Sequence, residues 1–271
     1  MLHFQPAATN PASQPDADLE PITHLVQAMR GFICRFTVML YGYRQIALLG
    51  AVNGHSAGAL ANQPVMRWFM DHAFTRGVVL DLRAMVEDNK KSLGAGAIAH
   101  GLMNPDVRAG LCTYLDACPP ERRVTDPVER GKYLDYVTTY AAQLATRPKK
   151  SATVPPVPPL VTKTELIRRW ANKAIAHITL DHYEVHGDDL RDVVIATAFV
   201  ASAIEKVMGN AGCDTDLVMC EQNAISDGRA LLGLSAPVVN FMPDIRSIMD
   251  LSIQTGTEVS LPGPTHLESV K

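Results

Sequence analysis

DLRDVVIATAFVASAIEKVM, residues 189–208, is the stretch that most clearly indicates the fold of this chain. Its apolar side chains recur every three or four residues, the spacing that places them on one face of an α-helix. That face consists of Leu190, Val194, Thr197, Ala201, Ile204 and Met208, flanked by Val193, Val200 and Val207. Asp188 precedes the run, and aspartate is a favoured helix cap. The pattern therefore predicts a capped, buried helix over residues 189–208.

The same helical periodicity recurs along the rest of the chain, and no β-rich stretch stands out. Among the expected helices are 22–52, 65–91 (one helix, or two broken near Gly77), 92–103, 105–118, 127–146 and 162–180. Capping signals support two of these starts, because Asn104 and Asp126 each precede a proline at the first helical position. The sequence thus predicts an all-α fold, a helical bundle of about five to seven helices.

The domain organisation follows from composition. Residues 1–20 are rich in Pro, Ala, Asn and Asp without periodicity, which is typical of a disordered arm. Residues 147–161, RPKKSATVPPVPPLV, contain five prolines and are expected to form an extended loop inside one helical domain, 21–212. Residues 213–271 are expected to be a C-terminal extension. Its stretch 236–253 carries two prolines and is expected to pack as an irregular tail.

Composition also narrows the class of protein. The net charge of −3 provides no global basic field, so any RNA contact must be local. The apolar run 31–52 is long enough to cross a bilayer, but Arg35 and Arg44 interrupt it, which indicates a buried helix with two snorkelling arginines. The N-terminus lacks the features of a signal peptide, and the five cysteines are scattered without a CxxC pair. We expect a cytoplasmic protein with no membrane contact, no metal and no other cofactor.

The candidate site is the segment RRWANKAIAH, residues 168–177. A helical wheel places Ala171 within an apolar face and sets a basic ridge of Arg169, Lys173 and His177 along its edge. Histidine can move a proton near neutral pH, and fixed positive charge stabilises phosphoryl oxygens, so such a ridge suits metal-free RNA cleavage. The alternative is a solvated basic face without catalytic function, because the helix dipole by itself favours a histidine near the end of a helix.

The segment WANKAIAHITLDHYEV, residues 170–185, resembles the motif helix of the HEPN superfamily, in its abortive-infection, AbiU-like branch. Asn172, Lys173, Ala176 and His177 match the pattern RNKxxAH of that branch. Upstream, LRAMVEDNKKSL, residues 82–93, is similar to an earlier helix of the branch. The resemblance covers roughly residues 65–210.

This resemblance implies a dimeric helical bundle of an antiphage or toxin–antitoxin type system. It implies a metal-independent endoribonuclease or an RNA-binding protein, and an antitoxin or other partner protein. On this hypothesis His177 is the catalytic acid and base, and Asn172 orients it or the phosphate. Lys173 and Arg168 supply charge at the catalytic site, and the RNA-binding residues are Arg169, Lys173 and Arg83.

The sequence departs from the family pattern at Ala171, where the motif has arginine. Arg168 lies one turn earlier and Lys173 lies nearby, but lysine is a point charge that cannot clamp a phosphate in a bidentate manner. The alternative hypothesis is therefore a catalytically inactive helical module that dimerises or binds a partner protein. His182 and His186 are four residues apart, but they fall in a predicted turn, so surface histidines are favoured over a metal site.

Overall fold

The computed structural model describes residues 19–52, 63–147, 159–176, 187–209, 216–233 and 240–256. These residues form nine α-helices and no strand, which confirms the all-α class with more helices than the five to seven expected. The helices are α1 (Leu19–Val52), α2 (Pro64–Met85), α3 (Ala95–Met103), α4 (Pro105–Ala117), α5 (Pro127–Ala145), α6 (Pro159–Ala176), α7 (Gly187–Met208), α8 (Leu217–Leu232) and α9 (Met242–Thr255).

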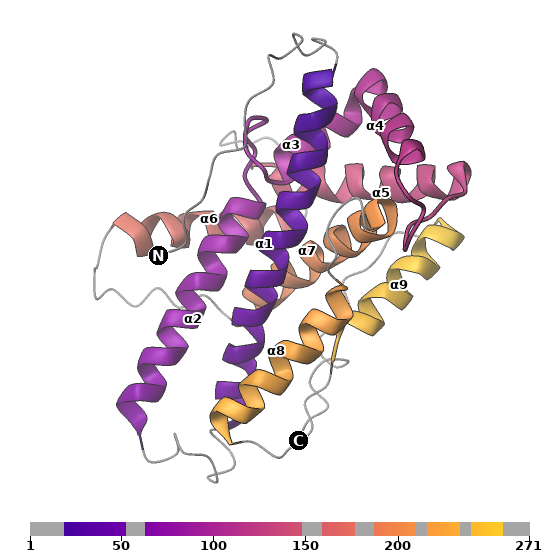
Figure 1. Ribbon diagram of the computed structural model, residues 1–271. Coiled ribbons are helices and arrows are strands. Elements are labelled where there is room, and N and C mark those ends of the chain that lie inside the picture. The colour runs from indigo at the N-terminus through magenta and orange to yellow at the C-terminus, as the bar shows by residue number, and fades with distance from the viewer. Residues whose placement is uncertain are drawn as a thin grey trace, which may run out of the picture.

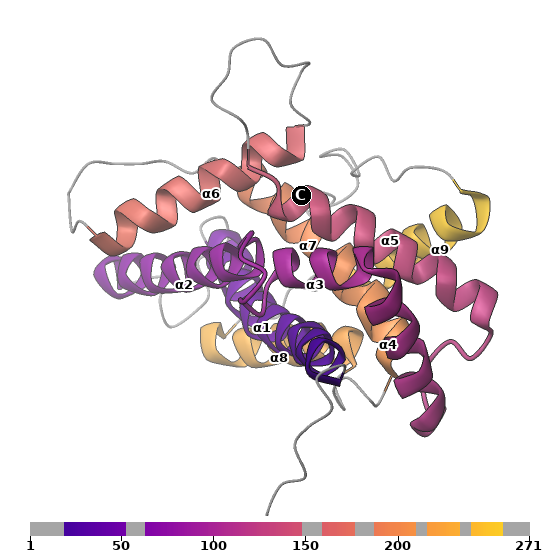
Figure 2. The ribbon, with the colours of Figure 1, turned by 90° about the horizontal axis from the view of Figure 1, so that it is seen from above.

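The helix α7 crosses the middle of the bundle and packs against α1, α5, α6 and α9 (Figures 1 and 2). Its apolar stripe is buried as predicted, and so are residues on its other faces, including Ile195, Ala198 and Phe199. A helix that is apolar all round belongs in the centre of a bundle. Residues 189–208 therefore form the central helix around which the others pack.

Three long helices lie side by side along one flank, with α1 between α2 and α8 (Figure 1). The contact between α1 and α8 depends on Gly228. A Cβ atom at that position would lie 2.4 Å from both the Gln45 and the Leu48 side chains. Gln45 also donates a hydrogen bond of 2.8 Å to the Ala224 carbonyl. The missing side chain at Gly228 thus lets α8 approach α1 closely.

Several helix starts agree with the capping signals in the sequence. Asn104 accepts a hydrogen bond of 3.0 Å from the Asp106 N–H, and Asp126 accepts one of 2.7 Å from the Glu129 N–H. The helix α2 runs through Gly77 without a break and ends at Met85, six residues before the expected end at Lys91.

Two predictions about prolines were wrong. The helix α6 begins at Pro159, inside the predicted loop 147–161 and before the predicted start at Thr162. The expected irregular tail contains α9, with Pro243 in its first turn. Proline lacks an N–H that the first turn of a helix does not need, so it starts a helix as readily as it ends one. This part of the chain thus supplies two helices to the bundle, α8 and α9, and α9 replaces the expected irregular tail.

The two arginines of α1 have different surroundings. Arg35 is partly exposed and pairs with Asp81 at 3.5 Å. Arg44 does not snorkel: it is buried, forms an ion pair with Glu221 of α8 and lies 4.2 Å from the Phe241 ring centre. None of the helices in the described ranges is long and apolar enough to cross a membrane.

The buried Glu221 also fixes the start of α9. It accepts hydrogen bonds from the backbone N–H groups of Phe241, at 3.1 Å, and Met242, at 2.8 Å. The first N–H groups of a helix have no partner within the helix, so this carboxylate acts as a cap supplied by another helix. Arg44, Glu221 and the first residues of α9 therefore connect three helices in one buried polar network.

Candidate functional site

The helix α6 carries the motif residues from Ala171 to Ala176, and its inner face packs in the core. Ala171 has 0% of its surface exposed, as the helical wheel predicted. It occupies the position at which the family pattern has arginine. A long cationic side chain there would have to displace core atoms. The position therefore contributes to packing in this chain.

Arg168 is buried and donates hydrogen bonds to three backbone carbonyls. The acceptors are Val86 O at 2.5 Å, Leu144 O at 2.7 Å and Thr146 O at 3.1 Å. Val86 follows the last residue of α2, and the other two lie at the end of α5. The final carbonyls of a helix lack partners within it and favour a cation. Arg168 therefore links the ends of two helices to α6.

Burial lowers the pKa of Arg168 from its ordinary value, and neighbouring Arg147 lowers it further, whereas nearby carboxylates, Glu165 first among them, raise it. Arg147 itself pairs with Glu87 at 3.2 Å and with Asp88 at 2.8 Å. Glu165 lies 3.3 Å from Arg169 and 3.7 Å from Arg168. Carboxylates thus counter the positive charges around the first half of the predicted basic ridge.

The other predicted site residues have varied surroundings. Asn172 is exposed on α6, one turn from Arg168 and Arg169, and Arg169 is also exposed. Arg83 is partly buried in the last turn of α2, and no ion pair involves it within the described ranges. Lys173 has a helical backbone, but its side chain and all of His177 lie outside the described residues. The described part of α6 thus exposes one amide and one paired cation.

A second surface was missed by the sequence reasoning. The first half of α2 exposes Val65, Trp68 and Phe69, with 78%, 66% and 62% of their surfaces accessible. The Trp68 and His72 rings stack, with centres 5.5 Å apart and planes at 12°. These four residues, which we call the α2 stripe, have the spacing of a core-facing helix. The spacing alone does not reveal that nothing in the described chain covers them.

A groove of about 430 Å³ lies beside this stripe, between the end of α1 and the start of α2. Trp68 belongs to both the stripe and the groove. The groove is lined by Ile46, Leu49, Gly50, Pro64, Arg67, Trp68 and Asp71. The lining of this groove therefore combines apolar and charged side chains.

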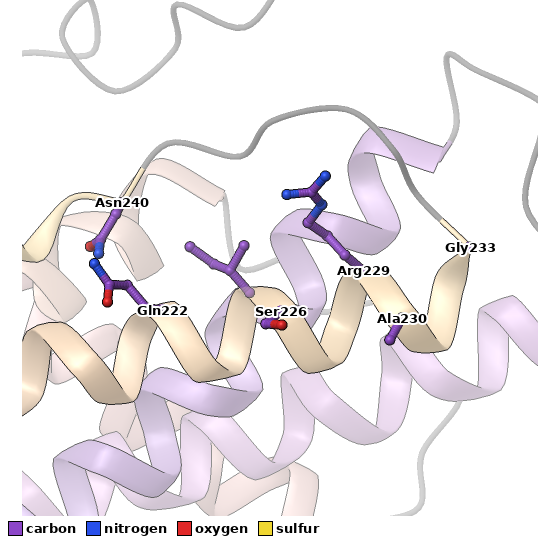
Figure 3. A pocket seen from close by; sticks show the side chains of 7 residues that line it. Gln222, Ser226, Arg229, Ala230, Gly233 and Asn240 are labelled. Atoms are coloured by element: carbon purple, nitrogen blue, oxygen red, sulfur yellow. The ribbon is translucent and has the colours of Figure 1, made fainter.

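A further hollow of about 450 Å³ lies along α8 and is shown in Figure 3. Gln222 and Asn240 lie close together at one end of it, and Arg229 lies farther along the helix. Ser226 is the hydroxyl among the described lining residues, and none of these is a histidine, cysteine or carboxylate that would activate it. The described part of this lining therefore holds no nucleophile–base pair.

No group of three or more His, Cys, Asp or Glu side chains in the described ranges is placed to hold a metal ion. His182 and His186, the pair considered from the sequence, lie outside those ranges. Comparisons of the chain with protein-family models, with curated proteins and with solved structures found no match.

Proposed function

We propose that this chain is a catalytically inactive HEPN-like module of an antiphage or toxin–antitoxin type system, which pairs with a second copy of itself. The observation that carries the proposal is the state of Ala171, where the motif has arginine, and of Arg168, the arginine one turn earlier that could replace it. Ala171 has no exposed surface, and Arg168 directs its N–H groups at backbone carbonyls.

The chemistry of RNA cleavage supports this reading. Stabilising the phosphoryl oxygens requires positive charge and N–H donors that face the substrate. The donors of Arg168 serve the ends of α2 and α5, and Arg169 is paired with Glu165. The arginine that remains exposed near Asn172 is therefore partly neutralised.

The α2 stripe supports pairing with a second copy. Large apolar side chains that lie next to one another on the surface often mark interaction surfaces in soluble proteins. Antiparallel pairing of two α2 helices about a two-fold axis would set Trp68 against Phe69 and Val65 against His72. One helix face thus offers complementary groups to its own copy.

The oligomeric state tests this pairing. Sedimentation velocity over a wide concentration range should show a dimer for the wild type and a monomer for the double variant Trp68→Ser, Phe69→Ser. Val128→Ser is the matched control, because Val128 is an equally exposed apolar residue on α5. It should remain a dimer. A monomeric wild type, or a double variant that still dimerises, would rule out this interface.

A metal-independent endoribonuclease is the second candidate. It is favoured by the exposure of Asn172 and Arg169 on α6. Labelled cellular RNA is incubated in EDTA with the wild type, His177→Ala and Asn172→Ala. Cleavage by the wild type that disappears in His177→Ala would establish the nuclease and overturn the inactive module. The inactive module predicts no cleavage by any of the three proteins.

A further inference from the structure

His72 is the titratable side chain of the α2 stripe, whose other members are Val65, Trp68 and Phe69. The stripe lies on the first half of α2, whereas the buried residues of that helix are all in its second half, from Val78 onward. Helix α2 also lies at one edge of the three-helix flank (Figure 1). A second copy that pairs through the stripe therefore has to enclose His72 as well.

In the single chain His72 is exposed, and its ring stacks on the indole of Trp68. A histidine gains a proton as the pH falls from about 7 to about 5. Water solvates the resulting imidazolium, and the face of an indole ring attracts a cation. The unpaired chain therefore accommodates the charged form of His72 at little cost.

The paired state offers His72 a different environment. Antiparallel pairing of two α2 helices sets Val65 of the second copy against it, as described above. A valine side chain has no hydrogen-bond acceptor, so it cannot partner a proton on the imidazole. Enclosing a charged group without a partner is unfavourable, and a neutral imidazole avoids this cost. The pair therefore favours the neutral form of His72.

The charged groups of α2 near His72 do not offset this cost. Arg76 is exposed one turn after His72, and two positive charges at this spacing repel each other. Asp71 is the neighbouring carboxylate, but it lines the groove between α1 and α2, on another side of the helix. No other described helix covers the stripe. In the antiparallel register the residues of the second copy nearest to His72 are Val65 and Trp68, which are uncharged.

We propose that protonation of His72 separates the two copies, so that the α2 interface forms at neutral pH and opens in mildly acidic solution. This regulation rests on the pairing proposed above. The free chains bind protons that the pair excludes, so the dissociation constant of the dimer rises as the pH falls. Each dimer contains two His72 side chains, and both contribute to this rise.

Sedimentation velocity of the full chain at pH 8.0 and at pH 5.5 measures the dissociation constant of the dimer. Each of the two histidines should contribute about a tenfold change over this range, so the wild-type dimer should weaken about a hundredfold. Most carboxylates stay ionised at pH 5.5, which limits other contributions. Circular dichroism at both pH values checks that the helices are retained.

Two substitutions fix the charge at this position. His72→Leu is always neutral and should give a dimer of equal affinity at both pH values. His72→Lys stays charged and should be monomeric at both. His100→Leu is the matched control, because His100 is an exposed histidine on α3, outside the stripe. It should retain the pH response of the wild type.

The outcomes distinguish the regulation from the pairing. A wild type that dimerises equally well at both pH values, or a pH response that persists in His72→Leu, would overturn the regulation and leave the pairing intact. A wild type that is monomeric at pH 8.0 would overturn the pairing itself, and the regulation with it.

Discussion

The guanidinium of Arg168 donates a hydrogen bond of 2.5 Å to the backbone carbonyl of Val86, a residue that precedes it by 82 positions. The same nitrogen donates to Leu144 O at 2.7 Å. Arg168 therefore stabilises the meeting point of α2, α5 and α6. An arginine that performs this task is a structural residue, and its substitution should change stability before it changes any activity.

Arg168→Ala should lower the free energy of unfolding by about 3 kcal/mol, because buried carbonyls that lose a donor cost about 1–3 kcal/mol each and do not add fully. Arg168→Lys should recover part of this loss, since an ammonium cannot reach all three acceptors at once. Urea denaturation followed by circular dichroism measures both values.

Arg169→Ala is the neighbouring control for this experiment. Arg169 is exposed and pairs with Glu165 one turn away, and such pairs contribute about 0.3–0.5 kcal/mol. Similar losses of stability in Arg168→Ala and Arg169→Ala would show that Arg168 has no structural role.

The sequence predicted the caps Asn104 and Asp126, the central helix and the burial of Ala171, because these depend on local spacing. The predicted cap Asp188 was wrong, because α7 begins one residue earlier, at Gly187. The sequence did not predict the surroundings of Arg168, which was expected to supply charge at the catalytic site. A wheel separates apolar from polar faces, but carbonyls from the ends of two other helices bury this polar residue. The burial of Glu221 could have been predicted, since its helical spacing places it with Leu217 and Gly228 on the buried face of α8. Its partner Arg44 lies 177 residues away, beyond any local pattern.

The ion pair of Glu221 and Arg44 leads to a second prediction. Glu221→Ala should destabilise the protein by about 3–5 kcal/mol, because it removes the carboxylate of a buried ion pair and the cap of α9. Adding Arg44→Leu to this variant should restore part of the stability, since the buried charge is then gone. Thermal unfolding of the two single variants and the double variant gives the coupling between them. Additive losses would contradict the proposed network.

Two glycines should respond in opposite directions to substitution by alanine. A Cβ atom on Gly96 would lie 2.6 Å from the backbone carbon of Asp88, so backbone atoms must move. Gly96→Ala should therefore cost about 1–3 kcal/mol or more. Gly77 lies in an exposed part of α2 with no atom within 4 Å of the added Cβ, so Gly77→Ala should stabilise the helix by up to about 1 kcal/mol. Chemical denaturation compares them directly, and a stabilising Gly96→Ala would show that α3 does not pack against this turn.

Stability should fall in alkaline solution because of Tyr133 and Tyr136. Burial raises the pKa of both phenols above the ordinary value of 10.0, and the hydrogen bond to Asp250 raises that of Tyr133 further. A folded-state pKa above the unfolded one means that the stabilisation is complete below about pH 10 and is lost as the pH rises beyond it. Each tyrosine that ionises only on unfolding lowers the free energy of unfolding by about 1.4 kcal/mol for every pH unit above 10.

Denaturation at a series of pH values from 9 to 11.5 measures this slope, and absorbance at 295 nm reports when the phenols ionise. In the double variant Tyr133→Phe, Tyr136→Phe the slope should be shallower than in the wild type, because two linked protons are absent. The single variants should differ at neutral pH: Tyr133→Phe loses a hydrogen bond worth about 1 kcal/mol, whereas Tyr136→Phe removes an unpaired hydroxyl and should be neutral or stabilising. A destabilising Tyr136→Phe would mean that this buried hydroxyl already has a partner in the folded protein.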